Sequence, residues 1–178
     1  MKTLDAKLLK KFLKLACDRL EGDWVLIGGT LLPILGMDLR VTTDIDLVAL
    51  DQTASNEKTL AVMKLADELG LPIETINQAG LYFLEKIKNY RSSLVILKQG
   101  KRSTIYRPDV NLYLLLKIPR MTESDFHDCC AFLKFAKQNK EPMNVRMIIQ
   151  TIKLELDDKT LFNEGKKTRL EQLLTLIS

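Results

Sequence analysis

The pattern of hydrophobic and polar positions changes character along the chain. Over residues 4–20, apolar residues recur every three or four positions and lysines fall on a different face, which predicts an amphipathic helix. Residues 23–27 form a short apolar run closed by Gly28-Gly29, which is typical of a buried strand entering a tight turn. Residues 43–50 alternate at first and then become continuously apolar. They predict a strand with one functional edge.

The remaining elements follow the same two periods. Short strands are expected at 73–76, 94–97 and 103–106, the last two as a β-hairpin, while 78–89 is ambiguous. Helices are expected at 31–35 with Thr30 as its cap, 55–69, 109–118, 122–138, 144–156 and 166–177. We therefore expect an α+β or α/β core over residues 1–118, with a helical C-terminal region over 119–178 packed on it in one overall domain.

Composition narrows the chemistry. The 178 residues carry 27 Lys+Arg, 23 Asp+Glu, one His and three Cys. One histidine cannot build a multi-histidine zinc site, and any triad would have to use His127, so carboxylates and lysines are the expected chemical groups. The three cysteines form no Cys-x-x-Cys pair, and no apolar run approaches the length that crosses a bilayer. The N-terminus lacks a signal-peptide pattern. We expect a cytoplasmic protein that does not associate with a membrane.

Two short motifs carry the candidate chemistry. Gly28-Gly29-Thr30 would present backbone N–H groups and a hydroxyl where a strand meets a helix, which suits a phosphate, although such turns are also common for steric reasons alone. Asp44 and Asp46 are two apart on a predicted strand, so both carboxylates project to one face and can share divalent ions. The competing interpretation of the two acids is a solvated strand face with an Arg40 ion pair.

Together these motifs resemble the signature of the polymerase-β-type nucleotidyltransferase superfamily, in particular its AbiEii-type toxins. The match consists of Gly28-Gly29-Thr30 followed by Arg40-x-Thr42-x-Asp44-x-Asp46-Leu47 and spans about twenty residues. The resemblance implies a mixed β-sheet core with helices packed on it. It implies that Gly28, Gly29, Thr30, Arg40 and Thr42 bind a nucleoside triphosphate and that Asp44 and Asp46 hold one or two Mg²⁺ ions.

A looser match lies downstream. In the AbiEii-like branch, a Lys near the end of an apolar helix precedes an Arg and an Asp-x-x-Asp, and here these resemble Lys117, Arg120, Asp125 and Asp128. The resemblance implies that Lys117 neutralises the triphosphate, that Arg120 contacts phosphate, and that Asp125 or Asp128 completes the metal site or deprotonates the acceptor. The alternatives are that Thr122 and Asp125 form a helix-capping pair, that Asp128 is helix surface and that Lys117 snorkels.

One feature departs from the superfamily. Classical members of the superfamily place a third carboxylate on a neighbouring strand, whereas 94–97 and 103–106 contain no acid here, and Glu85 is a remote candidate. Either the helix acids replace it or the site is degenerate. Two functions follow: transfer of a nucleotide to a hydroxyl of RNA, such as a tRNA end, or of a protein, in a toxin–antitoxin setting; or binding of a nucleotide or protein partner without catalysis.

Basic residues form two groups. Lys7, Lys10, Lys11 and Lys14 share one helical face, and Lys98, Lys101, Arg102 and Arg107 cluster around the expected hairpin. They suit either a phosphate-contacting surface for RNA or a solvated helix face with a charged turn that protects an edge strand. The net charge of +4 favours a polyanionic partner, but it does not distinguish between these two interpretations of the basic residues.

Overall fold

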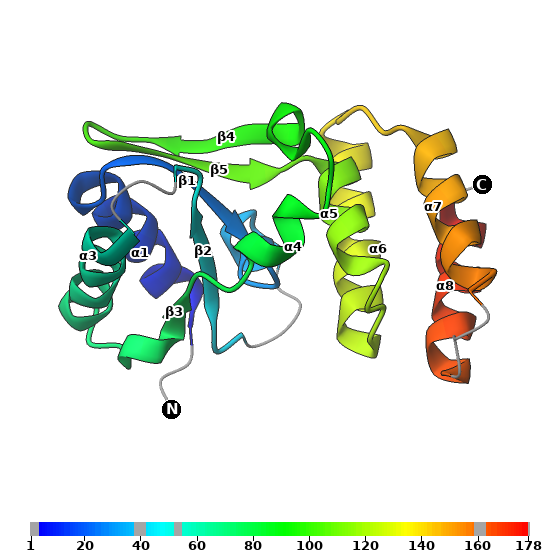
Figure 1. The fold of residues 1–178 in the computed structure, drawn as a ribbon, viewed down its shortest axis with the longest axis horizontal. Helices are drawn as coiled ribbons and strands as arrows, with labels where there is room; N and C mark the ends of the chain where they lie inside the picture. The colour runs from blue at the N-terminus through cyan, green and yellow to red at the C-terminus, as the bar shows by residue number, and fades with distance from the viewer. Residues whose placement is uncertain (1–3, 38–41, 52–54, 159–162, 178) are drawn as a thin grey trace. The chain divides into compact units, whose positions relative to one another are not determined.

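The structure is a computed structural model that describes residues 4–37, 42–51, 55–158 and 163–177 (Figure 1). The chain divides into two compact units, Met1–Pro108 and Asp109–Ser178, here called the sheet unit and the helical unit. The sequence predicts a boundary after residue 118, whereas this division falls before the first C-terminal helix.

The sheet unit contains a five-stranded mixed sheet in the order β3-β2-β1-β5-β4. In that order the strands are Ile76–Asn77, Ile45–Ala49, Gly22–Ile27, Ser103–Pro108 and Leu94–Gln99. Strand β1 is antiparallel to β2 and parallel to β5, while β4 and β5 form the antiparallel hairpin that the sequence predicts. The α+β class expected from the sequence is confirmed, with β3 and β4 at the two edges of the sheet (Figure 1).

Helices pack on the sheet through their apolar sides, and in its central strands β1 is buried from Trp24 onward and β2 at every position except Asp46. Helix α1 (Ala6–Arg19) is capped by the Asp5 carboxylate and buries Leu9, Phe12 and Leu13. It packs against β5 and against α3 (Ser55–Glu68). Gly80 lies against the Ile27 and Val48 side chains. This contact places the segment leading into α4 (Leu81–Glu85) against β1 and β2.

The sheet unit also shows where sequence patterns fail. The pattern predicts a strand over residues 73–76, but Ile73–Thr75 form a 3₁₀ turn, η1, and only Ile76 and Asn77 pair with β2. Pro72 precedes this turn with φ −54° and ψ 143°. The ambiguous segment 78–89 contains α4. A second 3₁₀ turn, η2 (Tyr90–Ser93), leads into β4.

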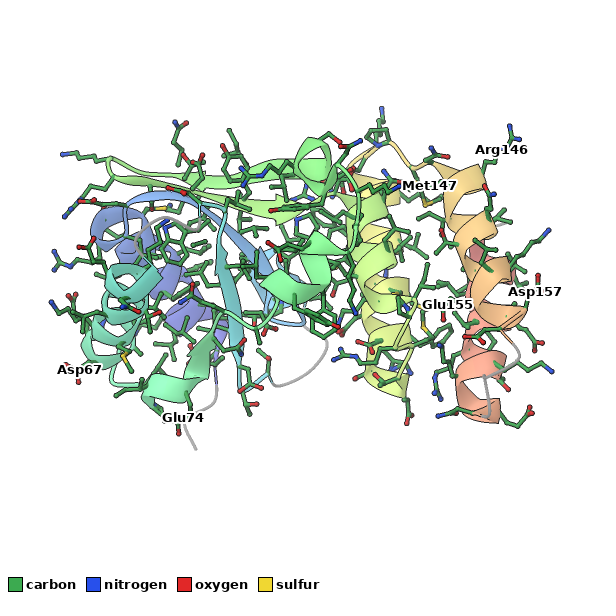
Figure 2. All side chains as sticks on the ribbon, viewed as in Figure 1. Asp67, Glu74, Arg146, Met147, Glu155 and Asp157 are labelled. Atoms are coloured by element: carbon green, nitrogen blue, oxygen red, sulfur yellow. The ribbon has the colours of Figure 1, made fainter. Side chains whose placement is uncertain are left out.

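The helical unit consists of four helices over its described residues. They are α5 (Val110–Lys117), α6 (Glu123–Gln138), α7 (Val145–Leu156) and α8 (Glu164–Ile177), which agree with the predicted ranges to within two residues. Helix α5 packs on α6, and α7 on α8, where Lys166 binds Glu155 at 2.8 Å. In Figure 2, Arg146 and Asp157 point outward from α7, in keeping with their exposure. No helix in the described ranges is long and apolar enough to cross a membrane.

Candidate functional site

The first half of the site is the contact between the turn after β1 and the carboxylate of Asp46. In the antiparallel register Ile27 lies opposite Asp46, so the chain leaving β1 passes directly beside the Asp46 side chain. Gly28 has φ +78°, and a Cβ at this position would lie 2.2 Å from Asp46 Oδ2. Only glycine fits, because both the left-handed backbone and the close approach exclude a side chain.

The second half is a group of hydroxyls that holds the backbone before β2. Thr30 is fully buried, and its hydroxyl donates a hydrogen bond to the carbonyl oxygen of Asp44. Thr42 donates to the same oxygen at 3.2 Å, and the two threonine hydroxyls lie 3.4 Å apart. These contacts join the segment before β2 to the turn after β1.

This arrangement corrects the expected role of Thr30. The sequence predicts a side-chain cap on the following helix, α2 (Leu31–Ile34), but the Thr30 side chain makes no capping bond and its backbone is helical. An N-cap needs an extended backbone. The Thr30 hydroxyl is directed to Asp44 instead, so Thr30 positions an acidic residue from within the protein.

Both acids of the pair lie at the start of β2. Asp44 immediately precedes the strand and is exposed, whereas Asp46 lies within it and is half-buried beside Asn77 of β3. Ile45 and Leu47, which flank Asp46, are fully buried. This alternation matches the expectation that the two carboxylates share one side of the strand. Arg40, the predicted partner in this motif, lies outside the described residues.

The carboxylates of Asp44 and Asp46 suit a hard divalent cation if a bound ligand supplies further oxygen atoms. Mg²⁺ commonly takes one or two carboxylates together with water and substrate phosphates, and here one carboxylate is exposed and the other lies beside a glycine turn. In the ranges described, no third acidic, His or Cys side chain joins Asp44 and Asp46 as a metal-binding group. Two carboxylates therefore match an ion shared with phosphate better than a closed protein cage.

The downstream residues come together in the helical unit as a buried ionic cluster. Lys117 Nζ donates to Asp125 Oδ1 at 2.8 Å and to Asp128 Oδ2 at 3.0 Å. The Lys117 side chain is 6% exposed, and the two aspartates are 0% and 1% exposed. The alternative interpretation, that Asp128 lies on the helix surface, is therefore wrong. Within this unit the lysine neutralises carboxylates that would be costly to bury alone.

Asp125 is the centre of the cluster. Arg120 donates to it through Nε at 2.7 Å and Nη2 at 2.6 Å, a bidentate contact. Thr122 donates from its backbone and its hydroxyl, and accepts from the Asp125 backbone N–H, which completes a capping box at the start of α6. The capping alternative for Thr122 and Asp125 is therefore confirmed.

These contacts set the protonation state of Asp125. Burial alone would raise the pKa of its carboxyl group, but hydrogen bonds from Arg120, Lys117 and Thr122, with the charge of Lys117, hold that pKa well below its usual range. Cys129, which follows Asp128 on the helix, is buried beside the same charges, and its burial raises the pKa of its thiol. The cluster is thus ionised at Asp125, with an unreactive thiol next to it.

The structure groups the predicted site residues into two sets. Gly28, Thr30, Thr42, Asp44 and Asp46 gather at one end of β1 and β2 in the sheet unit. The other set, in the helical unit, contains Lys117, Arg120, Asp125 and Asp128. A catalytic role for this second set stays a prediction, because its described contacts account for it as the structural start of α6.

Three other residues complete the comparison with the sequence. Glu85, the remote candidate for a third acid, is exposed in α4 and lines an open hollow with Leu50 and Arg91, at the other end of β2 from Asp44. His127 is exposed on α6. Asn77 cannot be identified from the sequence, because its place beside Asp46 depends on a two-residue strand that carries no periodic signal.

No protein-family model matches the chain, and neither the curated proteins nor the solved structures contain a match.

Proposed function

We propose that the chain is a Mg²⁺-dependent nucleotidyltransferase that binds a nucleoside triphosphate beside Gly28 and Asp46 and transfers its nucleotidyl group to a hydroxyl acceptor. The observation that carries this proposal is the close packing of the Gly28 turn against the Asp46 carboxylate. This packing brings the backbone of a glycine turn next to a carboxylate. The glycines and the acid follow the order and spacing of the motif that resembles the nucleotidyltransferase signature.

The surrounding contacts support the same function. Thr30 and Thr42 both donate to the Asp44 carbonyl, so two side-chain hydrogen bonds fix the backbone at Asp44. A site that acts mainly by positioning charged groups depends on such rigidity. Thr30 and Thr42 are accordingly positioning residues, while Asp44 and Asp46 provide the carboxylates that would hold Mg²⁺.

The chemistry is an in-line substitution at the α-phosphorus. The acceptor oxygen forms a new bond to that phosphorus, the bond to the β-phosphate oxygen breaks, and pyrophosphate leaves. The hydroxyl proton passes to a carboxylate or to water. A bound Mg²⁺ supplies neutralisation of charge on the triphosphate. The chain's own contribution is to orient the phosphates at the Gly28–Gly29 turn and to fix the two carboxylates beside them.

A second candidate is a related protein that binds nucleotide, or a protein partner, without catalysis. It is favoured by the contacts of Asp125 and Asp128, which are buried and engaged by Lys117 in the helical unit. In the described ranges, no third carboxylate accompanies Asp44 and Asp46. Binding without transfer is the outcome that distinguishes this candidate.

Incubation of the protein with α-phosphate-labelled nucleoside triphosphates, Mg²⁺ and either bulk tRNA or cell protein tests the transfer. We expect label on one acceptor, and its loss in Asp44→Asn/Asp46→Asn. The control Asp67→Asn/Glu74→Gln removes two other exposed acids of the same unit, which point outward in Figure 2, and should retain the transfer. Transfer that survives Asp44→Asn/Asp46→Asn contradicts the proposal.

A further inference from the structure

The outer face of α1 carries a row of lysines. Lys7, Lys10, Lys11 and Lys14, here the lysine stripe, lie at the spacing that gathers side chains on one helix face, and all four are exposed. In the described part of the chain, none of the four forms an ion pair. The stripe extends about 10 Å along the helix axis.

Acidic residues stand at the ends of the stripe and not within it. Asp5 caps α1, where its carboxylate accepts from the Leu8 backbone N–H at 2.7 Å. Asp18 is exposed about one turn beyond Lys14. Between these two acids, over residues 6–17, α1 carries lysines and no acidic residue.

The β4–β5 turn adds further positive charge close to the end of α1. Ser103 Oγ donates to the Ala16 carbonyl at 3.1 Å. Gly100 packs so closely on Cys17 that a Cβ there would lie 2.5 Å from the Cys17 Cβ. Lys98, near the end of β4, and Lys101, in the turn, are both exposed. A second pair of lysines thus lies beyond the C-terminal end of the stripe.

From these features we propose that the lysine stripe and the adjoining turn bind the phosphodiester backbone of a nucleic acid, without reading its sequence. A duplex presents about six phosphate charges over a length of about 10 Å, which suits lysines fixed in a row. Phosphate contacts position a nucleic acid, whereas sequence is read at base edges. The proposed surface consists of residues of α1 and the β4–β5 turn and includes neither Asp44 nor Asp46, so its binding does not require nucleotide transfer.

Two other polyanionic partners fit the stripe less well. An amphipathic helix binds a membrane by inserting its apolar face, but that face of α1 is already in the core: Leu9 and Phe12 are 0% exposed. Protein interfaces are depleted in lysine, and the stripe contains no aromatic or arginine anchor. A repeating phosphate backbone needs neither insertion nor an anchor.

Fluorescence anisotropy with labelled RNA and DNA of about 20 nucleotides, single-stranded and duplex, tests the proposal over a series of salt concentrations. We expect the full chain to bind at least one of them, with an affinity that falls steeply with salt. The variant Lys7→Gln/Lys10→Gln/Lys11→Gln/Lys14→Gln should bind at least about tenfold more weakly at about 100 mM salt. The slope of log affinity against log salt should become shallower by about one for each lysine that no longer meets a phosphate.

A matched control separates the stripe from overall charge. Lys134→Gln/Lys137→Gln/Lys140→Gln/Lys153→Gln removes the same number of charges from exposed positions of the helical unit and should change affinity by less than about threefold. Gln retains good helix propensity, and circular dichroism confirms that each variant is folded. Equal weakening by the two variants overturns the proposal, as does absence of nucleic-acid binding or stripe-dependent binding to anionic vesicles alone.

A further variant separates this proposal from the proposed transfer. Asp44→Asn/Asp46→Asn should bind the same oligonucleotides as well as the natural chain or slightly better, because it removes only negative charge. A weakened oligonucleotide affinity in that variant would mean that the nucleic acid binds at the acidic site, which contradicts a surface on α1.

Discussion

Gly28 combines a left-handed backbone with a close approach to the Asp46 carboxylate. Its backbone has φ +78°, and the space that a side chain would need is occupied by the Asp46 carboxylate. Gly22 has a similar φ of +82° with nothing within 4 Å of its notional Cβ. The two glycines therefore separate the cost of a left-handed backbone from the cost of the close approach.

We predict that Gly28→Ala destabilises the protein more than Gly22→Ala. Both substitutions place alanine in a conformation that costs about 1 kcal/mol or more. Gly28→Ala must also displace Asp46, and so should weaken binding of Mg²⁺ and nucleotide as well. Urea denaturation and nucleotide titration of the two variants measure these effects. Equal losses of stability, with nucleotide affinity unchanged in both, would show that the Asp46 contact is unimportant.

Thr30 offers a test of positioning. Thr30→Val keeps the side-chain shape but removes the hydroxyl that donates to the Asp44 carbonyl, so we expect a loss of about 1 kcal/mol in the free energy of unfolding. Nucleotide affinity in the presence of Mg²⁺ should fall too, because the Asp44 carbonyl loses one of the two hydroxyls that hold it. Thr151→Val, which removes a hydrogen bond to the Met147 carbonyl in α7, serves as control. Unchanged nucleotide affinity in Thr30→Val contradicts the positioning role.

At the scale of residues, the sequence predicts which residues belong to the candidate site better than it predicts which atoms their side chains contact. The Gly28-Gly29 turn and the Asp44/Asp46 pair follow from an apolar run, a glycine pair and strand alternation, all of which are local patterns. The direction of the Thr30 hydroxyl does not follow, because its acceptor is a carbonyl fourteen residues away that only strand pairing brings near. Asn77 is missed for the same reason.

At the scale of elements, the start of α6 depends on one carboxylate. Asp125 links the helix cap, through Thr122, to the end of α5, through Lys117. A buried ion pair is weak evidence of net stability, but removal of one partner leaves a buried charge uncompensated. The helix junction is therefore sensitive to the charge of this side chain.

We predict that Asp125→Asn destabilises the protein by about 3 kcal/mol at pH 7. Because the pKa of Asp125 is lowered in the folded state, its stabilising effect is complete above the unfolded pKa of about 4 and is lost as pH falls toward the folded value. Stability of the variant should thus fall less steeply between about pH 5 and about pH 2. Glu123→Gln, an exposed acid of the same helical turn, should leave the slope unchanged. Parallel acid limbs for Asp125→Asn and the natural chain contradict this assignment.

Periodic elements are the ones that sequence predicts well. Helices α5 to α8 and the β4–β5 hairpin have strong periods or turn signals and are confirmed. Helix α4 and strand β3 are short, and their conformations depend on neighbours: Gly80 packs on Ile27 and Val48, and β3 exists only through its pairing with β2. Short elements of this kind have no period of their own to read.

At the scale of the whole molecule, the candidate chemistry is divided between the two compact units. The sheet unit holds the glycine turn, the acidic pair and the lysine stripe, and the helical unit holds the ionic cluster around Lys117. The nucleotide site as we propose it is composed of residues of the sheet unit. If so, Asp128→Asn should reduce the free energy of unfolding but leave nucleotide affinity in the presence of Mg²⁺ within about twofold, measured under conditions where the variant is fully folded.

A much larger loss of nucleotide affinity in folded Asp128→Asn would contradict that division. It would favour instead the role that the superfamily resemblance implies for the acids of α6. Lys134→Gln, a single charge change at an exposed position of α6, is the matched control for both measurements.

The central claim is that Asp44 and Asp46 bind Mg²⁺ together with a nucleoside triphosphate. Isothermal titration of the full chain with ATP, GTP, CTP and UTP in turn, with Mg²⁺ and with excess chelator, tests it most directly. We expect binding of at least one triphosphate that requires Mg²⁺, is weakened at least about tenfold in Asp44→Asn/Asp46→Asn and is retained in Asp67→Asn/Glu74→Gln. Absence of binding to every triphosphate, or binding that is indifferent to Mg²⁺ and to the loss of Asp44 and Asp46, would contradict the claim.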